Sequence, residues 1–132
     1  MPHRFSTIVA SSGFGNKLGG MIDVEKGGIW VLSPSPELIG NPFLQALHGG
    51  AVTAFLQLAC GSVVARQIDR PTLPRLISTN VQFLAPVLLQ QVLARPIVRR
   101  VGRRVAFIHA EAWQDDPNVP VCAIQCEFSV SD

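Results

Sequence analysis

A histidine followed by two glycines, His48-Gly49-Gly50, precedes a long apolar segment and could form a site for a developing negative charge. The first turn of a helix has backbone N–H groups without intrahelical acceptors and carries a partial positive charge. An oxygen that becomes anionic during attack on a carbonyl is stabilised by such groups. Glycine has no Cβ, so a ligand can approach the backbone closely at these positions. The alternative is that the two glycines only permit tight packing of the helix against a sheet.

Gln57 is a polar side chain inside this apolar segment, nine residues after His48. In a helix, nine residues rise ~13.5 Å and turn through ~900°, which places Gln57 on the opposite face from His48. One subunit therefore cannot easily bring both residues to one carbonyl, but a second subunit related by a two-fold axis could supply Gln57. An amide does not act as a general base, although its carbonyl oxygen can orient a water. Alternatively, Gln57 is a polar residue at a helix–helix contact.

The element that must position these residues is predicted as a helix over residues 49–67. Its apolar residues cover a wide surface, which is typical of a buried helix, and Asp69-Arg70-Pro71 ends it. Alternating or short apolar runs bounded by Gly, Pro and Asn predict strands at residues 21–24, 29–32, 75–84, 88–100, 103–114 and 119–130.

This order of elements favours an α+β fold in which an antiparallel sheet curls around one long central helix. The strands after the helix are expected to form a meander, because short turns join the last three of them. The length of 132 residues fits a single domain, residues 1–132, with an irregular or short helical lead-in over residues 1–18.

Composition restricts the function classes. The chain is 48% hydrophobic and only 15% charged, which predicts that part of its surface is buried between subunits. A net charge of +2 argues against general nucleic-acid binding. No apolar run approaches 18 residues and no signal-peptide pattern is present, so we expect a cytoplasmic protein without a membrane partner. Its cysteines lack metal-ligand spacing, which predicts buried free thiols and no metal: Cys60, Cys122 and Cys126.

Four segments at suitable separations together resemble one family. The residues from Gly27 to Leu32 resemble its second strand, and Asn41 to Gly50 its active-site loop. Asn80 to Pro86 resembles the strand that follows the helix and ends in proline, and Val98 to Ala106 resembles a hairpin near coenzyme A phosphates. Over residues 18–130 the chain is thus similar to hotdog-fold acyl-CoA thioesterases of the phenylacetate-pathway, or PaaI-like, type.

The resemblance implies a hotdog fold, hydrolysis of acyl-CoA thioesters, and a homodimer or a dimer of dimers with sites shared between subunits. Coenzyme A would be part of the substrate, and no separate cofactor is expected. The Gly49 N–H would bind the thioester oxygen beside Gly50, and His48 would orient the loop or the sulfur side. Relatives carry Asp or Glu, a general base or nucleophile, where this chain has Gln57.

The resemblance also suggests substrate contacts. Relatives often carry Asn or Gln six residues before the histidine, where Pro42 stands here, so the neighbouring Asn41 is the candidate for that role. Gln45 is a further polar candidate, and Ser78 could face the same cleft. Apolar candidates for the acyl pocket, suited to medium-chain or aromatic acids, are Phe43, Leu47, Phe55 and Phe83. Glu37 is a candidate carboxylate for residual hydrolysis.

Four arginines surround the turn of the expected hairpin: Arg99, Arg100, Arg103 and Arg104. Guanidinium groups bind phosphate through paired hydrogen bonds, so these residues are candidates for binding the coenzyme A phosphates. Strand alternation places Arg99 and Arg100 on opposite faces, so about half of the group could meet one ligand. The alternative is an exposed turn that keeps an apolar protein in solution.

Three functions therefore compete. The first is an acyl-CoA thioesterase in which a water, positioned by Gln57 of a second subunit, attacks a thioester polarised at Gly49. The alternative is a non-enzymatic acyl-CoA or acyl-carrier binding protein that has lost its catalytic carboxylate. A hydratase of the same fold is the third, and it is disfavoured because no Asp-to-His dyad with hydratase spacing is found.

Overall fold

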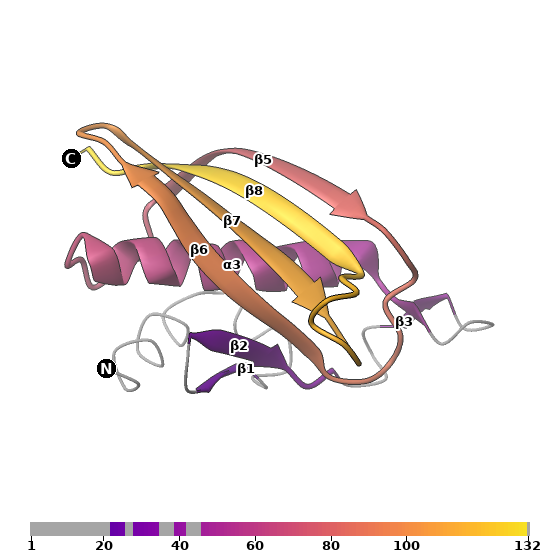
Figure 1. Cartoon of the computed structure of the whole chain (residues 1–132). Coiled ribbons are helices and arrows are strands. Elements are labelled where there is room, and N and C mark those ends of the chain that lie inside the picture. The colour runs from indigo at the N-terminus through magenta and orange to yellow at the C-terminus, as the bar shows by residue number, and fades with distance from the viewer. Residues whose placement is uncertain (1–21, 26–27, 35–38, 42–45, 132) are drawn as a thin grey trace.

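A computed structural model of the chain describes residues 22–25, 28–34, 39–41 and 46–131. One helix, α3 (Gly49–Gln67), lies against a curved antiparallel sheet (Figure 1). The sheet has six strands in the order β1-β2-β6-β7-β8-β5. Their bounds are β1 (Ile22–Glu25), β2 (Ile29–Leu32), β5 (Arg75–Phe83), β6 (Val92–Val101), β7 (Val105–Trp113) and β8 (Cys122–Ser129).

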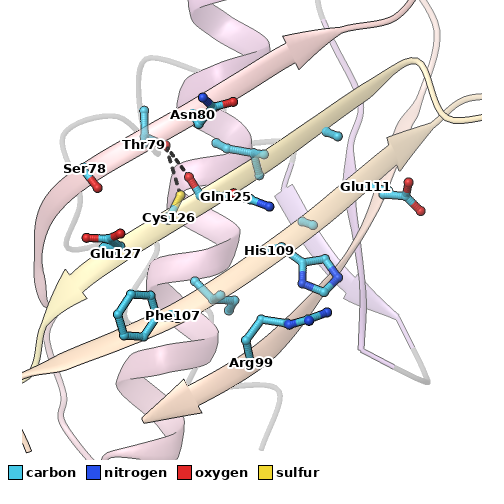
Figure 2. Close-up of a pocket in the computed structure, with 14 residues that line it drawn as sticks. Ser78, Thr79, Asn80, Arg99, Phe107, His109, Glu111, Gln125, Cys126 and Glu127 are labelled. Atoms are coloured by element: carbon cyan, nitrogen blue, oxygen red, sulfur yellow. Dashed lines mark hydrogen bonds between the residues drawn. The ribbon is translucent and has the colours of Figure 1, made fainter. Parts of the chain in front are cut away.

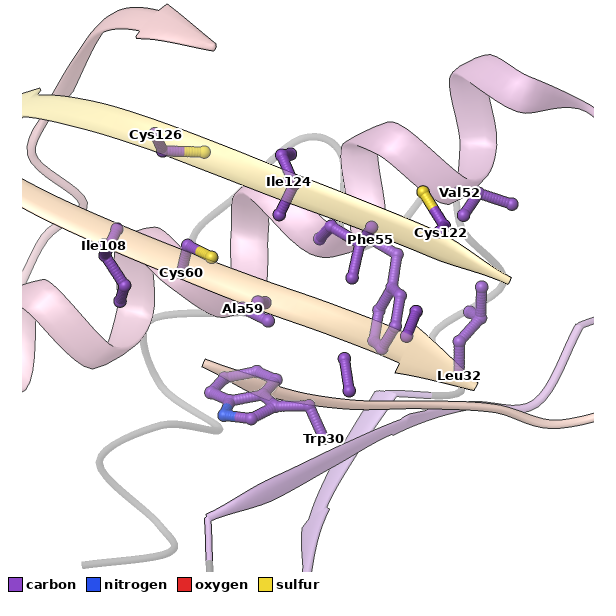
Figure 3. Close-up of a cluster of buried hydrophobic side chains, with 14 of the residues drawn as sticks. Trp30, Leu32, Val52, Phe55, Ala59, Cys60, Ile108, Cys122, Ile124 and Cys126 are labelled. Carbon is purple, nitrogen blue, oxygen red and sulfur yellow. The ribbon is translucent and has the colours of Figure 1, made fainter. Parts of the chain in front are cut away.

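The core lies between α3 and the inner face of the sheet. Burial alternates along β7 and β8, so that Ile108, Ile124 and Phe128 point toward the helix. The helix contributes Val52, Phe55 and other buried residues to the same core (Figure 3). By length and composition α3 could also cross a membrane, but the sheet covers it as it would a core helix. The expected α+β arrangement, an antiparallel sheet around one central helix, is confirmed.

The thiols of the cysteines are free and buried, as expected. Burial raises the pKa of Cys122 to about 11. A hydrogen bond between Cys60 and Cys126 raises the pKa of Cys60 and lowers that of Cys126. Figure 3 shows these side chains in the layer between the helix and the sheet.

The strands after the helix do not form the expected four-strand meander. β6, β7 and β8 are consecutive neighbours, but β5 pairs with β8 at the edge of the sheet. The connection between β5 and β6 therefore passes from one part of the sheet to another, and β6 begins at Val92 instead of residue 88. Residues 88–91 are excluded from β6 because the Gln90 N–H bonds the Leu88 carbonyl within the connection.

A second, two-stranded sheet stands just before the helix, in a region expected to be a loop. It pairs β3 (Ile39–Asn41) with β4 (Ala46–Leu47). The predicted lead-in over residues 1–18, and the candidates Glu37, Phe43 and Gln45, lie outside the described residues.

Candidate active site at the start of the central helix

His48 is the N-cap of α3. Its backbone is extended, with φ −62° and ψ 128°, and its side-chain Nδ1 accepts a hydrogen bond from the Gly50 N–H at 3.0 Å. Because Nδ1 is the acceptor, the neutral ring carries its proton on Nε2, which remains available as a donor. The His48 carbonyl accepts from the N–H groups of Ala51 and Val52 at 3.0 and 3.2 Å. His48 thus accepts hydrogen bonds from three backbone N–H groups of the first turn of the helix.

The Gly49 N–H is the exception. The first N–H groups of a helix lack regular intrahelical partners, and in this first turn the N–H groups of Gly50, Ala51 and Val52 all bond to His48. Among the described residues, no acceptor is bonded to the Gly49 N–H. This backbone donor at the positive end of the helix dipole is therefore free to receive a ligand oxygen.

A pocket of about 420 Å³ adjoins this donor. Gly49 lines one side of the pocket together with Ala46 and Leu47 of β4. The other side is lined by the end of β5 and the connection after it: Phe83, Leu84, Ala85, Pro86 and Val87. A methyl group added at Gly49 would stand 3.5 Å from Phe83 Cζ, so the phenyl ring lies beside this glycine. The lining is apolar, which suits a hydrophobic acyl group.

The structure places the expected acyl-pocket residues in two different environments. Phe83 and Leu47 line this pocket, whereas Phe55 is completely buried in the core. Phe55 is therefore a packing residue, because α3 turns it toward the sheet. Asn41 lies in β3 beside β4, and its partner there is Ala46.

Gln57 lies two turns further along α3 and is half-buried. None of the hydrogen bonds among the described residues involves its side chain. The helix begins at Gly49, so the relevant separation is eight residues, or a rise of ~12 Å and a rotation of ~80° beyond two full turns. The axial distance, more than the helix face, separates Gln57 from the Gly49 donor within one chain.

Ser78 does not join this site within the chain. Register pairs Ser78 with Glu127, whose neighbours Cys126 and Phe128 point into the core. Because directly paired residues share a face, Ser78 lies on the outer face of the sheet. Thr79 faces the helix instead, and its Oγ1 lies 3.2 Å from Cys126 Sγ. Sequence alternation could not assign these faces because a bulge between Leu76 and Ser78 shifts the register.

The outer face holds a separate, open pocket of about 850 Å³ (Figure 2). Ser78, Arg99, His109, Gln125 and Glu127 are among its lining residues. The sheet stands between this pocket and the core, so its polar groups cannot act on a ligand bound at Gly49 of the same chain.

A second bulge corrects the expectation for the arginines. Val98 pairs with Ile108 and Arg100 with Phe107, so Arg99 is the extra residue between them. Arg99 lines the outer pocket together with Phe107, the partner of Arg100. Arg99 and Arg100 therefore share the outer face instead of pointing to opposite faces, because the bulge interrupts strand alternation.

The arginine hairpin also lies far from Gly49 within one chain. Phe83, beside Gly49, pairs with Cys122, and Cys122 pairs with Ala112 of β7. The partner of Arg100 on the same strand is Phe107, roughly 16 Å further along. Figure 1 shows the β6–β7 turn at the end of the sheet where α3 finishes. The described residues contain no group of three or more His, Cys, Asp or Glu that could hold a metal ion.

Comparison with known families identifies this arrangement. The family model described as the thioesterase superfamily matches residues 44–121, more than half of the chain. The chain belongs to the thioesterase superfamily. The match includes β4, the His-Gly-Gly turn, α3, β5 and the arginine hairpin. No curated protein sequence gave a significant match.

Several solved structures share the fold of this chain. The chain is similar to a phenylacetic acid degradation-related protein of Ralstonia eutropha, with 21% identity, a TM-score of 0.77, and coverage of 96% of this chain and 99% of that one. The PaaI protein of E. coli has 14% identity, a TM-score of 0.73, and coverage of 96% and 95%. A Bacillus halodurans protein solved with CoA has 18% identity, a TM-score of 0.74, and coverage of 96% and 87%. These similarities establish the hotdog fold of this thioesterase-superfamily chain.

Proposed function

We propose that the protein is an acyl-CoA thioesterase whose active site is centred on the Gly49 N–H. The observation that carries this proposal is the Gly49 N–H, which has no bonded acceptor among the described residues and lies next to an apolar pocket. A thioester oxygen bound there would be polarised by the N–H group and by the helix dipole. The acyl chain would pack against Phe83 and its neighbours in the pocket. The CoA-bound structure of the Bacillus halodurans protein supports this choice of ligand.

A second subunit would complete the site. Gln57 and the arginine hairpin are both displaced from Gly49 toward the end of α3, so neither reaches the pocket within its own chain. A two-fold axis that reverses the direction of α3 would bring both to the pocket of the partner. The arginines would then bind the phosphates of coenzyme A, and Gln57 would orient the attacking water through its carbonyl oxygen.

The exposed surfaces support this dimer. β5 is a nine-residue edge strand, and every residue except Val81 is exposed. Its apolar residues include Leu76 and Ile77, which are 36% and 49% exposed. An edge of this length with apolar side chains favours pairing with a second strand. The half-exposed helix residues Thr53 and Gln57 also lie four apart, on a stripe that a partner helix could cover.

The helix geometry defines where the axis would pass. For Gln57 of one subunit to stand level with Gly49 of the other, antiparallel helices must cross halfway between these residues, at Thr53. A Thr53→Cys variant should therefore form a covalent dimer with a short bismaleimide. A matched Gln67→Cys variant, at the exposed end of the helix, should remain uncrosslinked.

A binding protein without turnover is the second candidate, and Gln57 is the observation that favours it. Glutamine has no carboxylate, and loss of acid–base catalysis costs ~10²–10⁴-fold in rate. In this case Gly49 and the pocket would hold the thioester without hydrolysing it.

Thiol release from a panel of aliphatic and aromatic acyl-CoAs, with binding measured in parallel, separates the two functions. The thioesterase proposal predicts turnover by the natural protein, a large loss in Gln57→Ala and a gain in Gln57→Glu. Binding by a silent natural protein, together with activity of Gln57→Glu, would establish the binding function instead. Absence of both binding and hydrolysis across the panel would refute both candidates.

A further inference from the structure

Gln114, the residue directly after β7, makes three hydrogen bonds to the connection between β5 and β6. Its Oε1 accepts from the Leu88 N–H at 3.0 Å. Its Nε2 donates to the Leu88 carbonyl at 2.9 Å and to the Gln90 carbonyl at 3.3 Å. The side-chain amide therefore pairs with both backbone groups of Leu88, much as a neighbouring strand would.

The connection that Gln114 holds forms one wall of the candidate active site. Residues 83–87 line the pocket opposite Gly49. The Leu47 N–H donates to the Val87 carbonyl at 2.7 Å, and Ala46 forms a bridge with Leu88. Leu47 directly precedes the helix cap His48. A short path of hydrogen bonds and covalent links thus runs from Gln114 through Leu88 and β4 to the free Gly49 donor.

Further contacts hold this connection on either side of Leu88. Its first part is held by the Val121 carbonyl, which accepts from Leu84 and Ala85 at 2.8 and 3.3 Å. The Val87 side chain is buried in the core and Leu89 packs against it, whereas the side chains of Leu84 and Leu88 are 57% and 42% exposed, so apolar burial contributes little at Leu88 itself. The Gln114 amide is the side chain that holds the backbone of Leu88 through both its N–H and its carbonyl.

From these contacts we infer that Gln114 is a positioning residue of the active site. It holds the pocket wall and β4 at the distance from Gly49 that an acyl group requires. This inference rests on the proposed function and adds to it a residue that does not touch the substrate.

A carboxylate at this position gives a pH-dependent test. In Gln114→Glu the ionised side chain can still accept from Leu88 N–H, but it cannot donate to the two carbonyls and repels them. Protonation at low pH restores one donor. We expect the KM for acyl-CoA to rise at least about 2- to 10-fold at neutral pH, the size of the effect of one neutral hydrogen bond. The KM should return toward the natural value as pH falls to about 4.3.

Two further variants complete the comparison. Gln114→Ala should show the raised KM at every pH, because no protonation restores its contacts. Gln125→Glu introduces the same charge on the outer face of β8 and should change neither KM nor its pH profile. A KM of Gln114→Glu that is unchanged at neutral pH, or raised equally at all pH values, would overturn the inference.

Amide hydrogen exchange supplies a readout that does not depend on turnover. Exchange at Leu88 and Leu47 should accelerate in Gln114→Ala and in ionised Gln114→Glu, but not in Gln125→Glu. Accelerated exchange with no thioester hydrolysis by the natural protein would contradict the proposed function while supporting the Gln114 contacts. Unchanged exchange would contradict the inference itself, whatever the enzyme activity.

Discussion

The backbone N–H of Gly49 is set apart from its neighbours by the chemistry of a single residue, His48. The imidazole accepts a hydrogen bond from the Gly50 N–H, and the His48 carbonyl accepts from the N–H groups of Ala51 and Val52. A capping side chain that stabilises the helix therefore also leaves one donor exposed to the pocket. At this scale, the His-Gly-Gly sequence has two roles, because the histidine organises the turn and the first glycine remains open to a ligand.

The two glycines should respond differently to substitution. A methyl group at Gly50 would stand 3.1 Å from His48 Nδ1 and 3.2 Å from Cε1, so the imidazole must move and the cap is weakened. We expect Gly50→Ala to lower the free energy of unfolding by about 0.5–2 kcal/mol, the usual value of an N-cap. Urea denaturation measures this change.

His48 variants provide the control for that cap. His48→Ala should show a loss of similar size, and His48→Asn should recover most of it, because asparagine is also a good N-cap acceptor. Equal stability of His48→Ala and the natural protein would show that the observed Nδ1 contact does not stabilise the helix.

At the level of elements, α3 and β5 together define the site. The helix presents Gly49 at its start, and β5 ends at Phe83 against that glycine. Both also present surface that the described chain does not cover, along the β5 edge and beside Gln57 on the helix. The same two elements thus form the pocket and would form the proposed subunit contact.

A charge on the β5 edge should separate the subunits. We expect Ile77→Lys to shift the protein from dimer to monomer in light scattering after gel filtration, because an edge lysine opposes strand pairing. Thiol release should fall with dissociation, since the proposed site needs both chains. The matched variant Ile97→Lys replaces an apolar residue that is 48% exposed on the outer face of β6 and should leave the dimer intact. A natural protein that is already monomeric and active would contradict the shared site.

The elements were largely predictable from sequence, whereas the pairing was not. The apolar surface and the Asp69-Arg70-Pro71 stop predicted the helix over residues 49–67, which the structure confirms. Strand alternation also predicted β5 to within one residue and β7 to within two residues at each end. Local patterns contain no information about which distant strand is the neighbour, so the pairing of β5 with β8 was missed.

Among the functional residues, features set by local sequence were likewise predictable, whereas features set by strand pairing were not. The helix start at His48-Gly49 depends on local chemistry and was predictable, whereas the binding of a thioester oxygen by the Gly49 N–H stays a prediction. The faces of Ser78 and Arg99 depend on bulges, which a period-two pattern does not reveal. Gln114 could not be recognised, because its contacts join residues 24 and 26 positions apart.

At the scale of the molecule, the described part of the chain carries basic and acidic groups at opposite ends of the sheet. Arg100, Arg103 and Arg104 lie near the end of the sheet where α3 finishes. Asp115 and Asp116 lie in the turn after β7, at the opposite end. In an antiparallel dimer, the basic end of one subunit would lie near the pocket and acidic turn of the other, which favours both assembly and capture of an anionic substrate.

Substrates with and without phosphates should reveal this arrangement. We expect Arg103→Ser/Arg104→Ser to lower kcat/KM for an acyl-CoA by at least about tenfold, the loss of one charge-assisted hydrogen bond. The same variant should hydrolyse the corresponding acyl-pantetheine, which has no phosphate, at the natural rate. Equal effects on both substrates, measured by thiol release, would show that the arginines do not bind the coenzyme A phosphates.

The most direct measurement for the central claim is acyl-CoA hydrolysis by Gly49→Ala. The added methyl fits without a clash, 3.5 Å from Phe83 Cζ, so the free energy of unfolding should stay close to the natural value. It lies in the pocket beside the free N–H and should block approach of the thioester oxygen. We predict a fall in kcat of ~10²–10³-fold, comparable to removal of one oxyanion donor. A folded Gly49→Ala protein that releases thiol at the natural rate would contradict the account.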